Sequence, residues 1–512
     1  MVVVCLSLNV DTWHNMSFKY LQAYATKSKL YPEIEFVDLE YKLHENLPKI
    51  YQDVLGSKPD ILAISCYVWN RRKYFDVLPH IKEKLPNLKV ITGGPEFQWE
   101  FVDEFNQYDF LDYVVVGEGE KAFLSLLEYQ FSNKLNTNDK LSKISGLIYR
   151  GSNGKILSNK NPEFADINAI PSPYFSEVIK PESIKNSRAQ IQTQRGCPLT
   201  CGFCYESKLS NKVRYFQIER VFAEIDYILE NGADYIYFLD STFNSNRKRA
   251  KQILKYLVKK RKKNNFEISV EVVPEFLDSE TILLCKATGL KRMEMGIQSL
   301  DKKAIDVMDR FRDEAKLFAN INTCVKIGLP IIAQLIYGLP GDNIKIFLRG
   351  FDKLYSLKIF KVGIFGLQLL PGTLYRDQAK ILGIKFDKYS YYIIESSDFS
   401  KNDLGRLANF KNVVLFTNGI KPLINKMLTK ANIKPSKFFM EFVDFRQKQK
   451  PEYITYIKIP ISIGELITFI KLTEFIDSTP DYKFEFSELR DFLQNWLNLR
   501  MCDIKLVDGK KT

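Results

Sequence analysis

Short apolar runs alternate with amphipathic segments along two long stretches of this chain, and that alternation limits the possible folds more than any other feature. In residues 1–130 the runs have the length of buried strands and lie at Val2–Leu8, Ile34–Leu39, Ile61–Ser65, Lys89–Thr92 and Tyr113–Val116. Helical patterns such as Ser17–Ser28 and Lys73–Leu85 separate them. This alternation predicts a parallel sheet with helices on both faces.

The alternation returns from residue 186 onward, with candidate strands at Ala189–Thr193, Tyr235–Leu239, Glu267–Val272, Arg292–Gly296, Ile331–Tyr337 and Lys361–Gln368. Helical patterns such as Ile218–Leu229 and Ser279–Ala287 fill the gaps between these strands. Six strand–helix units in about 190 residues suit a barrel or partial barrel. The active site of such a fold lies at the carboxyl ends of its strands.

A chain of 512 residues is too long for one hydrophobic core, and we divide it into four parts. We expect an α/β protein with a flavodoxin-like or Rossmann-like domain over 1–133, a linker over 134–185, a (β/α)6 partial barrel over 186–378 and a mainly helical domain over 379–512. The linker contains one expected hairpin, SGLIYRGSNGKIL, with its tight turn at Ser152-Asn153-Gly154.

Polar or glycine-rich loops follow four strands of the first predicted sheet. They are Asn9-Val10-Asp11, Cys66–Asn70, Gly93–Glu96 and Gly117–Glu120. Ligands of open α/β sheets bind outside the carboxyl ends of the strands. The four loops therefore predict one common crevice.

Three of the eight cysteines form a cluster: Cys197, Cys201 and Cys204 lie within eight residues, on a loop just after a predicted strand. A closed zinc site would need a fourth Cys or His, and no histidine follows His80. A 4Fe-4S cluster normally takes four thiolates, so three would leave one iron free to bind a substrate. The other cysteines are expected to be small buried apolar side chains: Cys5, Cys66, Cys285, Cys324 and Cys502.

The Cys-x3-Cys-x2-Cys spacing, with the aromatic Phe203 before the last cysteine, resembles the signature of the radical S-adenosylmethionine (SAM) superfamily. The resemblance implies that the open iron binds the amino and carboxylate groups of SAM. One electron from the cluster would then cleave the sulfonium to methionine and a 5′-deoxyadenosyl radical, which the barrel shields from water.

Weaker motifs follow the cysteines in the order seen in that family. Gly296-Ile297-Gln298-Ser299 resembles a strand end that contacts SAM, and Leu339-Pro340-Gly341-Asp342 resembles a turn near the adenine. For each motif a plain turn or cap is the alternative interpretation. The SAM-contacting residues that the resemblance implies are Phe203, Asp240, Glu271, Gln298, Ser299 and Tyr337.

The first domain is similar to the cobalamin-binding half of cobalamin-type radical SAM proteins, in which GGPE and GEGE loops are typical. The Asp-x-His-x-x-Gly motif that coordinates cobalt in other cobalamin domains has no match here. We expect His14 at a helix start or facing a substrate rather than on cobalt. The corrin contacts that the resemblance implies are Asn9, Ser65, Tyr67, Trp69, Asn70, Gly93, Gly94, Glu96, Gly117 and Glu118.

The C-terminal segment, which contains Lys388–Ser397, resembles an uncharacterised helical domain found on some members of this subgroup. Tyr389, Tyr391 and Tyr392 lie within this segment, and we expect them in the core rather than on a substrate surface.

The resemblance implies a cobalamin-dependent radical SAM enzyme, most often a C-methyltransferase in this subgroup. Methylcobalamin would donate its methyl group to a substrate carbon radical. Cyclisation or rearrangement without net methylation stays open. Transfer RNA methylthiolation is less favoured because it needs three more N-terminal cysteines, and residues 1–130 contain only Cys5 and Cys66. A non-catalytic cobalamin sensor is less favoured because the three-cysteine motif is intact.

The net charge of +13 leaves nucleic acid, an anionic substrate or a lysine-rich genome as explanations. The strongest basic run, Arg247–Lys263, has apolar residues at helical spacing, so a solvated helix face is favoured over a nucleic-acid contact. No signal peptide or bilayer-length apolar stretch is present, so we expect a cytoplasmic protein without a membrane partner. The partners implied by the resemblance are a small-molecule or peptide substrate and a low-potential electron donor such as flavodoxin or ferredoxin.

Overall fold

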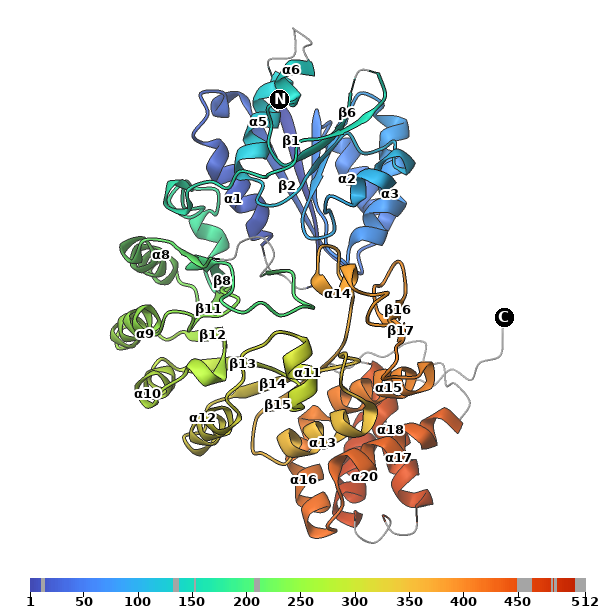
Figure 1. The fold of residues 1–512 in the computed structure, drawn as a ribbon. Coiled ribbons are helices and arrows are strands. Elements are labelled where there is room, and N and C mark those ends of the chain that lie inside the picture. Colours follow the sequence, from blue (N-terminus) through green and yellow to red (C-terminus); the bar gives the residue numbers. More distant parts are fainter. Residues whose placement is uncertain are drawn as a thin grey trace.

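Two mainly parallel sheets and a C-terminal group of helices make up the fold (Figure 1). The computed structural model describes residues 1–10, 14–131, 138–151, 153–206, 212–448, 463–479, 482 and 486–501. Three positions discussed above lie outside these ranges: Asp11, Ser152 and Cys502. Among the described helices, none is long and apolar enough to cross a membrane.

The first sheet has the strand order β2-β1-β3-β4-β5-β6-β7. The first five strands are parallel and in the order of flavodoxin, which confirms the predicted domain type. The last two pair antiparallel, so the expected hairpin forms and extends this sheet. The bounds are β1 (Val2–Asn9), β2 (Glu35–Lys42), β3 (Ile61–Ser65), β4 (Lys89–Gly93), β5 (Tyr113–Val115), β6 (Leu147–Arg150) and β7 (Ile156–Ser158).

Helices cover both faces of this sheet because its strands are apolar on both sides. Along β1, Val3 packs with side chains of α1 (Met16–Ala25) and α5 (Glu120–Phe131). Its neighbour Val4 points to the other face, with the helices α2 (Leu47–Gly56), α3 (Arg71–Lys84) and α4 (Phe101–Glu104). A further short helix, α6, spans Asn138–Leu141.

The second sheet has six parallel strands in the order β15-β14-β13-β12-β11-β8, which confirms the partial barrel. The strands are β8 (Arg188–Ile191), β11 (Tyr235–Phe238), β12 (Glu267–Val272), β13 (Leu290–Gln298), β14 (Ile331–Tyr337) and β15 (Lys361–Gly366). The helices are α8 (Ile218–Glu230), α9 (Arg247–Arg261), α10 (Ser279–Ala287), α11 (Lys302–Val307), α12 (Glu314–Lys326) and α13 (Ile344–Tyr355). The basic run is the amphipathic helix α9, as predicted.

The two faces of the barrel strands differ sharply in polarity. On β13, Met293, Met295 and Ile297 are buried in the apolar core beside the helices. The alternate residues Arg292 and Glu294 point to the barrel interior, because side chains alternate across a strand. A packed barrel core would place branched apolar residues there. The polar interior is therefore better suited to holding a ligand than to closing a core.

The C-terminal part begins with the short helix α14 (Leu374–Asp377) and the antiparallel pair β16 (Lys385–Phe386) and β17 (Ile393–Glu395). Packed aromatic rings join the helices that follow. These are α15 (Lys401–Phe416), α16 (Lys421–Lys430), α17 (Pro435–Lys448), α18 (Ile463–Ser478) and α20 (Ser487–Met501).

The expectation that the three tyrosines of this part are core residues is only partly correct. Tyr391 is buried, whereas Tyr389 is 79% and Tyr392 40% exposed. The local sequence does not distinguish them, because the short turn between β16 and β17 decides which ring points inward.

Candidate active site between the two sheets

The cysteine loop leaves the barrel through β9 (Gln194–Arg195), which pairs antiparallel with β10 (Arg214–Tyr215). Its middle is fixed by backbone hydrogen bonds from Gly202 N to Met308 O and from Tyr375 N to Gly202 O, both 2.9 Å. A Cβ atom at Gly202 would lie 2.7 Å from the Tyr375 ring, so this position requires glycine. The rigid loop holds the three thiols at one side of the barrel mouth.

The three thiols share an apolar surround. Cys201 is 3% exposed and packs with Leu199 and Val273, and the thiols of Cys197 and Cys204 are half-buried beside them. Burial raises the pKa of Cys197, and it raises the pKa of Cys204 to about 12. Burial therefore favours the neutral thiols, whereas a bound metal centre would stabilise the thiolates and lower these pKa values. Three soft sulfur donors in an apolar cup fit an iron–sulfur cluster.

Within the described ranges, no three His, Cys, Asp or Glu side chains meet closely enough to hold a single metal ion. A four-iron cluster spaces its thiolates more widely than one ion does.

Arg310 contacts this site and was missed by sequence reasoning, because it belongs to no motif. It donates from Nη1 to Cys201 Sγ at 3.3 Å and from Nη2 to Gly296 O at 2.6 Å. The side chain therefore links a cluster-ligand sulfur to the end of β13. The buried hydroxyl of Tyr375 was missed for the same reason, and within the described chain it has no hydrogen-bond partner.

Replacing Arg310 by glutamine is expected to lower the reduction potential of the bound cluster. A cationic donor to sulfur favours the reduced, more negative cluster, and a charge-assisted hydrogen bond contributes about 1.5–3 kcal/mol. For one electron this corresponds to roughly 60–130 mV. Redox titration followed by electron paramagnetic resonance (EPR) measures the shift. Lys302→Gln is the control, because Lys302 is exposed and pairs with Asp306 at 2.7 Å rather than with a thiol. Equal potentials in wild type and Arg310→Gln would contradict the assignment.

The Gly296–Ser299 and Leu339–Asp342 motifs, which are about 40 residues apart in the sequence, are in contact in the structure. The Ser299 hydroxyl donates to the Asp342 carboxylate at 3.1 Å, which joins the Gly-Ile-Gln-Ser strand end to the Leu-Pro-Gly-Asp turn. Gln298 adopts a φ of 67°, a left-handed conformation that is uncommon outside glycine and frequent at functional sites. Tyr337 is buried at the end of the neighbouring strand β14.

Glu271 and Phe203 also lie at this end of the barrel. Burial, with the nearby carboxylates of Glu294 and Glu206, raises the pKa of Glu271 to about 7. Phe203 packs against the apolar cup of the thiols. Their contacts to SAM stay predictions.

Asp240 forms hydrogen bonds with the residues just before the cysteine loop. Its carboxylate accepts from Thr193 N at 2.7 Å, Thr193 Oγ1 at 2.5 Å and Gln194 N at 3.2 Å. Burial outweighs these bonds and raises the pKa of Asp240 to about 6. The residue thus holds the start of the cysteine loop, and a contact with SAM stays a prediction.

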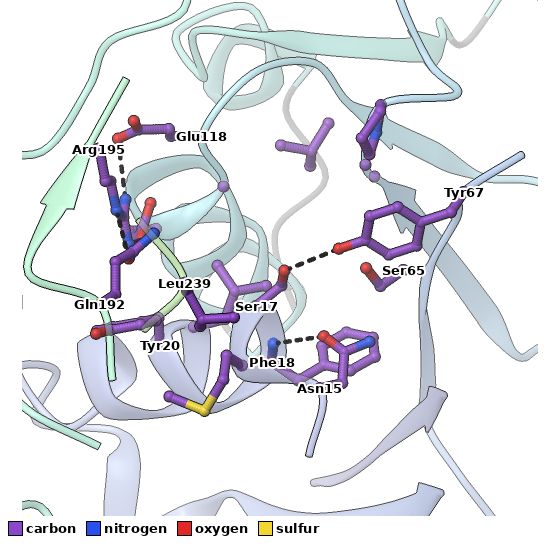
Figure 2. A pocket seen from close by; sticks show the side chains of 18 of the residues that line it. Asn15, Ser17, Phe18, Tyr20, Ser65, Tyr67, Glu118, Gln192, Arg195 and Leu239 are labelled. Carbon is purple, nitrogen blue, oxygen red and sulfur yellow. Dashed lines mark hydrogen bonds and ion pairs between the residues drawn. The ribbon is translucent and has the colours of Figure 1, made fainter. Parts of the chain in front are cut away.

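A cavity of about 750 Å³ lies between the first domain and the barrel (Figure 2). Most of the predicted corrin contacts line it: Asn9, Ser65, Tyr67, Trp69, Gly93, Gly94, Gly117 and Glu118. The barrel side contributes Gly196 and Tyr205, which adjoin Cys197 and Cys204 in the chain. The predicted common crevice therefore exists, and it reaches the cysteine loop.

The cavity wall combines flat aromatic rings with neutral hydrogen-bonding groups. The rings of Tyr67 and Trp69 stack with their centroids 4.5 Å apart. The hydroxyls of Tyr67 and Ser17 lie 3.2 Å apart (Figure 2). Thr92 is buried, and its hydroxyl has no hydrogen-bond partner among the described residues. A corrin ring carries amide side chains that such groups can bind, so the wall fits cobalamin.

Asn70 and Glu96 are the two predicted corrin contacts that do not line the cavity. Asn70 donates to Leu8 O and Ser65 O at 3.2 and 3.1 Å, so it shapes the loop after β3. Glu96 accepts from the Tyr391 hydroxyl at 2.8 Å. His14 lines the cavity just before α1, and its Nδ1 lies 3.1 Å from Glu40 Oε2.

Two family models match separate parts of the chain. Residues 2–127 match the family model of the B12 binding domain, and residues 191–352 match that of the radical SAM superfamily. The chain is a B12-binding radical SAM protein. The cavity described above thus lies between its B12 binding domain and its radical SAM domain.

Two curated relatives each match more than half of this chain. The cobalamin-dependent radical SAM methyltransferase TokK of Streptomyces tokunonensis is 25% identical over 365 residues, 63% of this chain and 51% of TokK. The chain spans about half the length of the curated relatives it matches.

Solved structures share the fold. The cobalamin-dependent SAM radical enzyme OxsB, solved with aqua-cobalamin and SAM, superposes with a TM-score of 0.67 at 16% identity, covering 98% of this chain and 81% of OxsB. TsrM of Kitasatospora setae, solved with cobalamin and a 4Fe-4S cluster, superposes with a TM-score of 0.60 at 14% identity. The superposition covers 86% of this chain and 99% of TsrM.

Proposed function

We propose that the chain is a cobalamin-dependent radical SAM enzyme that transfers a methyl group to an unactivated carbon of its substrate. The cavity carries this proposal, because loops of the B12 binding domain and residues next to Cys197 and Cys204 line it together. A corrin bound there would face the cysteine loop. Relatives named as methyltransferases favour methylation over cyclisation or rearrangement.

The side chains have distinct parts in this proposal. Cys197, Cys201 and Cys204 would hold a 4Fe-4S cluster, and the Gln298–Ser299 strand end with Glu271 would contact SAM. When bound, the cluster and SAM supply a radical that abstracts hydrogen, and cobalamin supplies the methyl group. A corrin bound between the two domains would help to keep water from the site.

The polar barrel interior would receive the substrate, a small molecule or peptide. The Glu294 carboxylate forms an ion pair with Arg292 Nε at 2.8 Å and accepts a hydrogen bond from Gln334 Nε2 at 2.5 Å. These three strand residues form one polar group there. An external low-potential donor, such as flavodoxin or ferredoxin, would reduce the cluster.

Anaerobic reconstitution tests the proposal. The protein loaded with iron, sulfide and cobalamin is expected to give 5′-deoxyadenosine from SAM only when a reductant is added. S-adenosylhomocysteine should form as well, because methylation consumes a second SAM as methyl donor. Formation of 5′-deoxyadenosine without S-adenosylhomocysteine would favour a rearrangement enzyme. Neither product from cluster-loaded, cobalamin-bound protein would contradict the enzyme proposal altogether.

A further inference from the structure

The cysteine loop is tied to the B12 binding domain before its first cysteine. Arg195 lies two residues before Cys197. It contacts Glu118, in the loop after β5, at 3.0 Å (Figure 2). It also contacts Glu120, the first residue of α5, at 2.7 Å. Arg214, the cross-strand partner of Arg195, also pairs with Glu118. The Arg195 side chain is only 11% exposed, so these are largely desolvated ion pairs.

A second contact between the cysteine loop and the B12 binding domain follows the last cysteine. Tyr205 comes directly after Cys204, and its hydroxyl accepts a hydrogen bond from Gln98 Nε2 at 2.9 Å. Gln98 follows the Gly93–Glu96 loop at the end of β4. The three cysteines are therefore bracketed by two contacts, both of which reach loops of the B12 binding domain.

The same loops form the cavity wall. Gly94, Pro95, Gly117 and Glu118 line the cavity, and so does Arg195. A ligand that orders these loops also orders the anchors of the cysteine loop. Removing one partner of a buried ion pair leaves an uncompensated charge, so the Arg195 tie is expected to be energetically significant.

We propose that Arg195 and Glu118 are positioning residues that couple occupancy of the cavity by cobalamin to retention of the cluster by the cysteine loop. The inference rests on the proposed function, because it takes these two groups as the occupants. Thermodynamic linkage requires each of them to strengthen the binding of the other by the same factor. Coupling between sites typically amounts to about 5- to 150-fold.

Cobalamin affinity of the full chain, with and without a reconstituted cluster, measures this coupling. Spectral titration of the wild type with hydroxocobalamin is expected to give a dissociation constant at least about fivefold lower when the cluster is present. In Arg195→Gln the ratio should fall close to one. Iron loss to a ferrous chelator should slow on cobalamin addition in the wild type and not in the variant.

Lys121→Gln is the matched control, because Lys121 follows Glu120 but pairs with the exposed Glu163 at 3.1 Å. It removes the same charge and should keep the wild-type ratio. Glu118→Gln serves as a second variant if Arg195→Gln fails to fold. The inference would be overturned if the wild type bound cobalamin equally well with and without the cluster. It would also be overturned if Arg195→Gln and Glu118→Gln both kept the wild-type ratio of dissociation constants. A wild type that binds cluster but no cobalamin would instead refute the proposed function.

Discussion

Cys201→Ala is expected to abolish the visible absorbance of the reconstituted iron–sulfur cluster, with iron content falling to background. Cys201 is the most buried of the three thiols and lies at the centre of the apolar cup, with Arg310 donating to its sulfur. Two thiolates cannot secure a four-iron cluster against chelation. Formation of 5′-deoxyadenosine should disappear with it.

The matched control for this variant is Cys324→Ala. Cys324 is fully buried on helix α12, away from the cysteine loop. Its replacement removes a buried thiol of the same size and should leave iron content and the spectrum unchanged. Retained cluster and activity in Cys201→Ala would refute the assignment of the ligands.

Gly94→Ala is expected to weaken cobalamin binding at least tenfold and to lower the melting temperature of the protein. Gly94 has a φ of 109°, and a Cβ atom there would lie 2.4 Å from Cys66 O. The backbone conformation alone would cost alanine roughly 1–3 kcal/mol. To relieve the clash, the ends of β3 and β4 must separate, and they form the floor of the cavity.

Gly56→Ala is the control in the same domain, because nothing lies within 4 Å of the Cβ position at the end of helix α2. That change should be neutral or slightly stabilising, since alanine favours helix. Spectral titration with cobalamin and thermal unfolding measure both effects. Wild-type affinity in Gly94→Ala would show that the loop after β4 does not contact the corrin.

Local patterns in the sequence were sufficient for most of the architecture. Buried parallel strands leave continuous apolar runs, so β12, β14 and helix α10 have the bounds that the sequence predicts. The cysteine spacing is also local, because all three thiols lie on one short loop. Most loop residues predicted for the first domain line the cavity, since the carboxyl ends of parallel strands meet at one edge.

Contacts between distant segments could not be predicted in the same way. Arg310 reaches Cys201 across 109 positions, and Glu96 bonds Tyr391 across 295. No periodicity marks either pair. The sequence resemblance implied Glu118 as a corrin contact, but nothing in the sequence joined Glu118 to Arg195. Some residues of a motif face a ligand, whereas others, such as Asn70, stabilise the loop through hydrogen bonds. The packing that separates the two kinds is visible only in the folded structure.

A barrel of six strands leaves a gap between its first and last strand, β8 and β15. The last strand packs against α15 and is followed by the β16–β17 hairpin, whose Tyr391 bonds to Glu96 of the B12 binding domain. Helix α15 and the β16–β17 hairpin, which lie outside the barrel, thus border the opening on the side of β15. The three thiols lie on the loop that follows β8, on its other side. Under the proposed function, the residues that frame the opening would contact the incoming substrate and the cysteine loop would activate its carbon. These two tasks would then fall to separate stretches of the sequence.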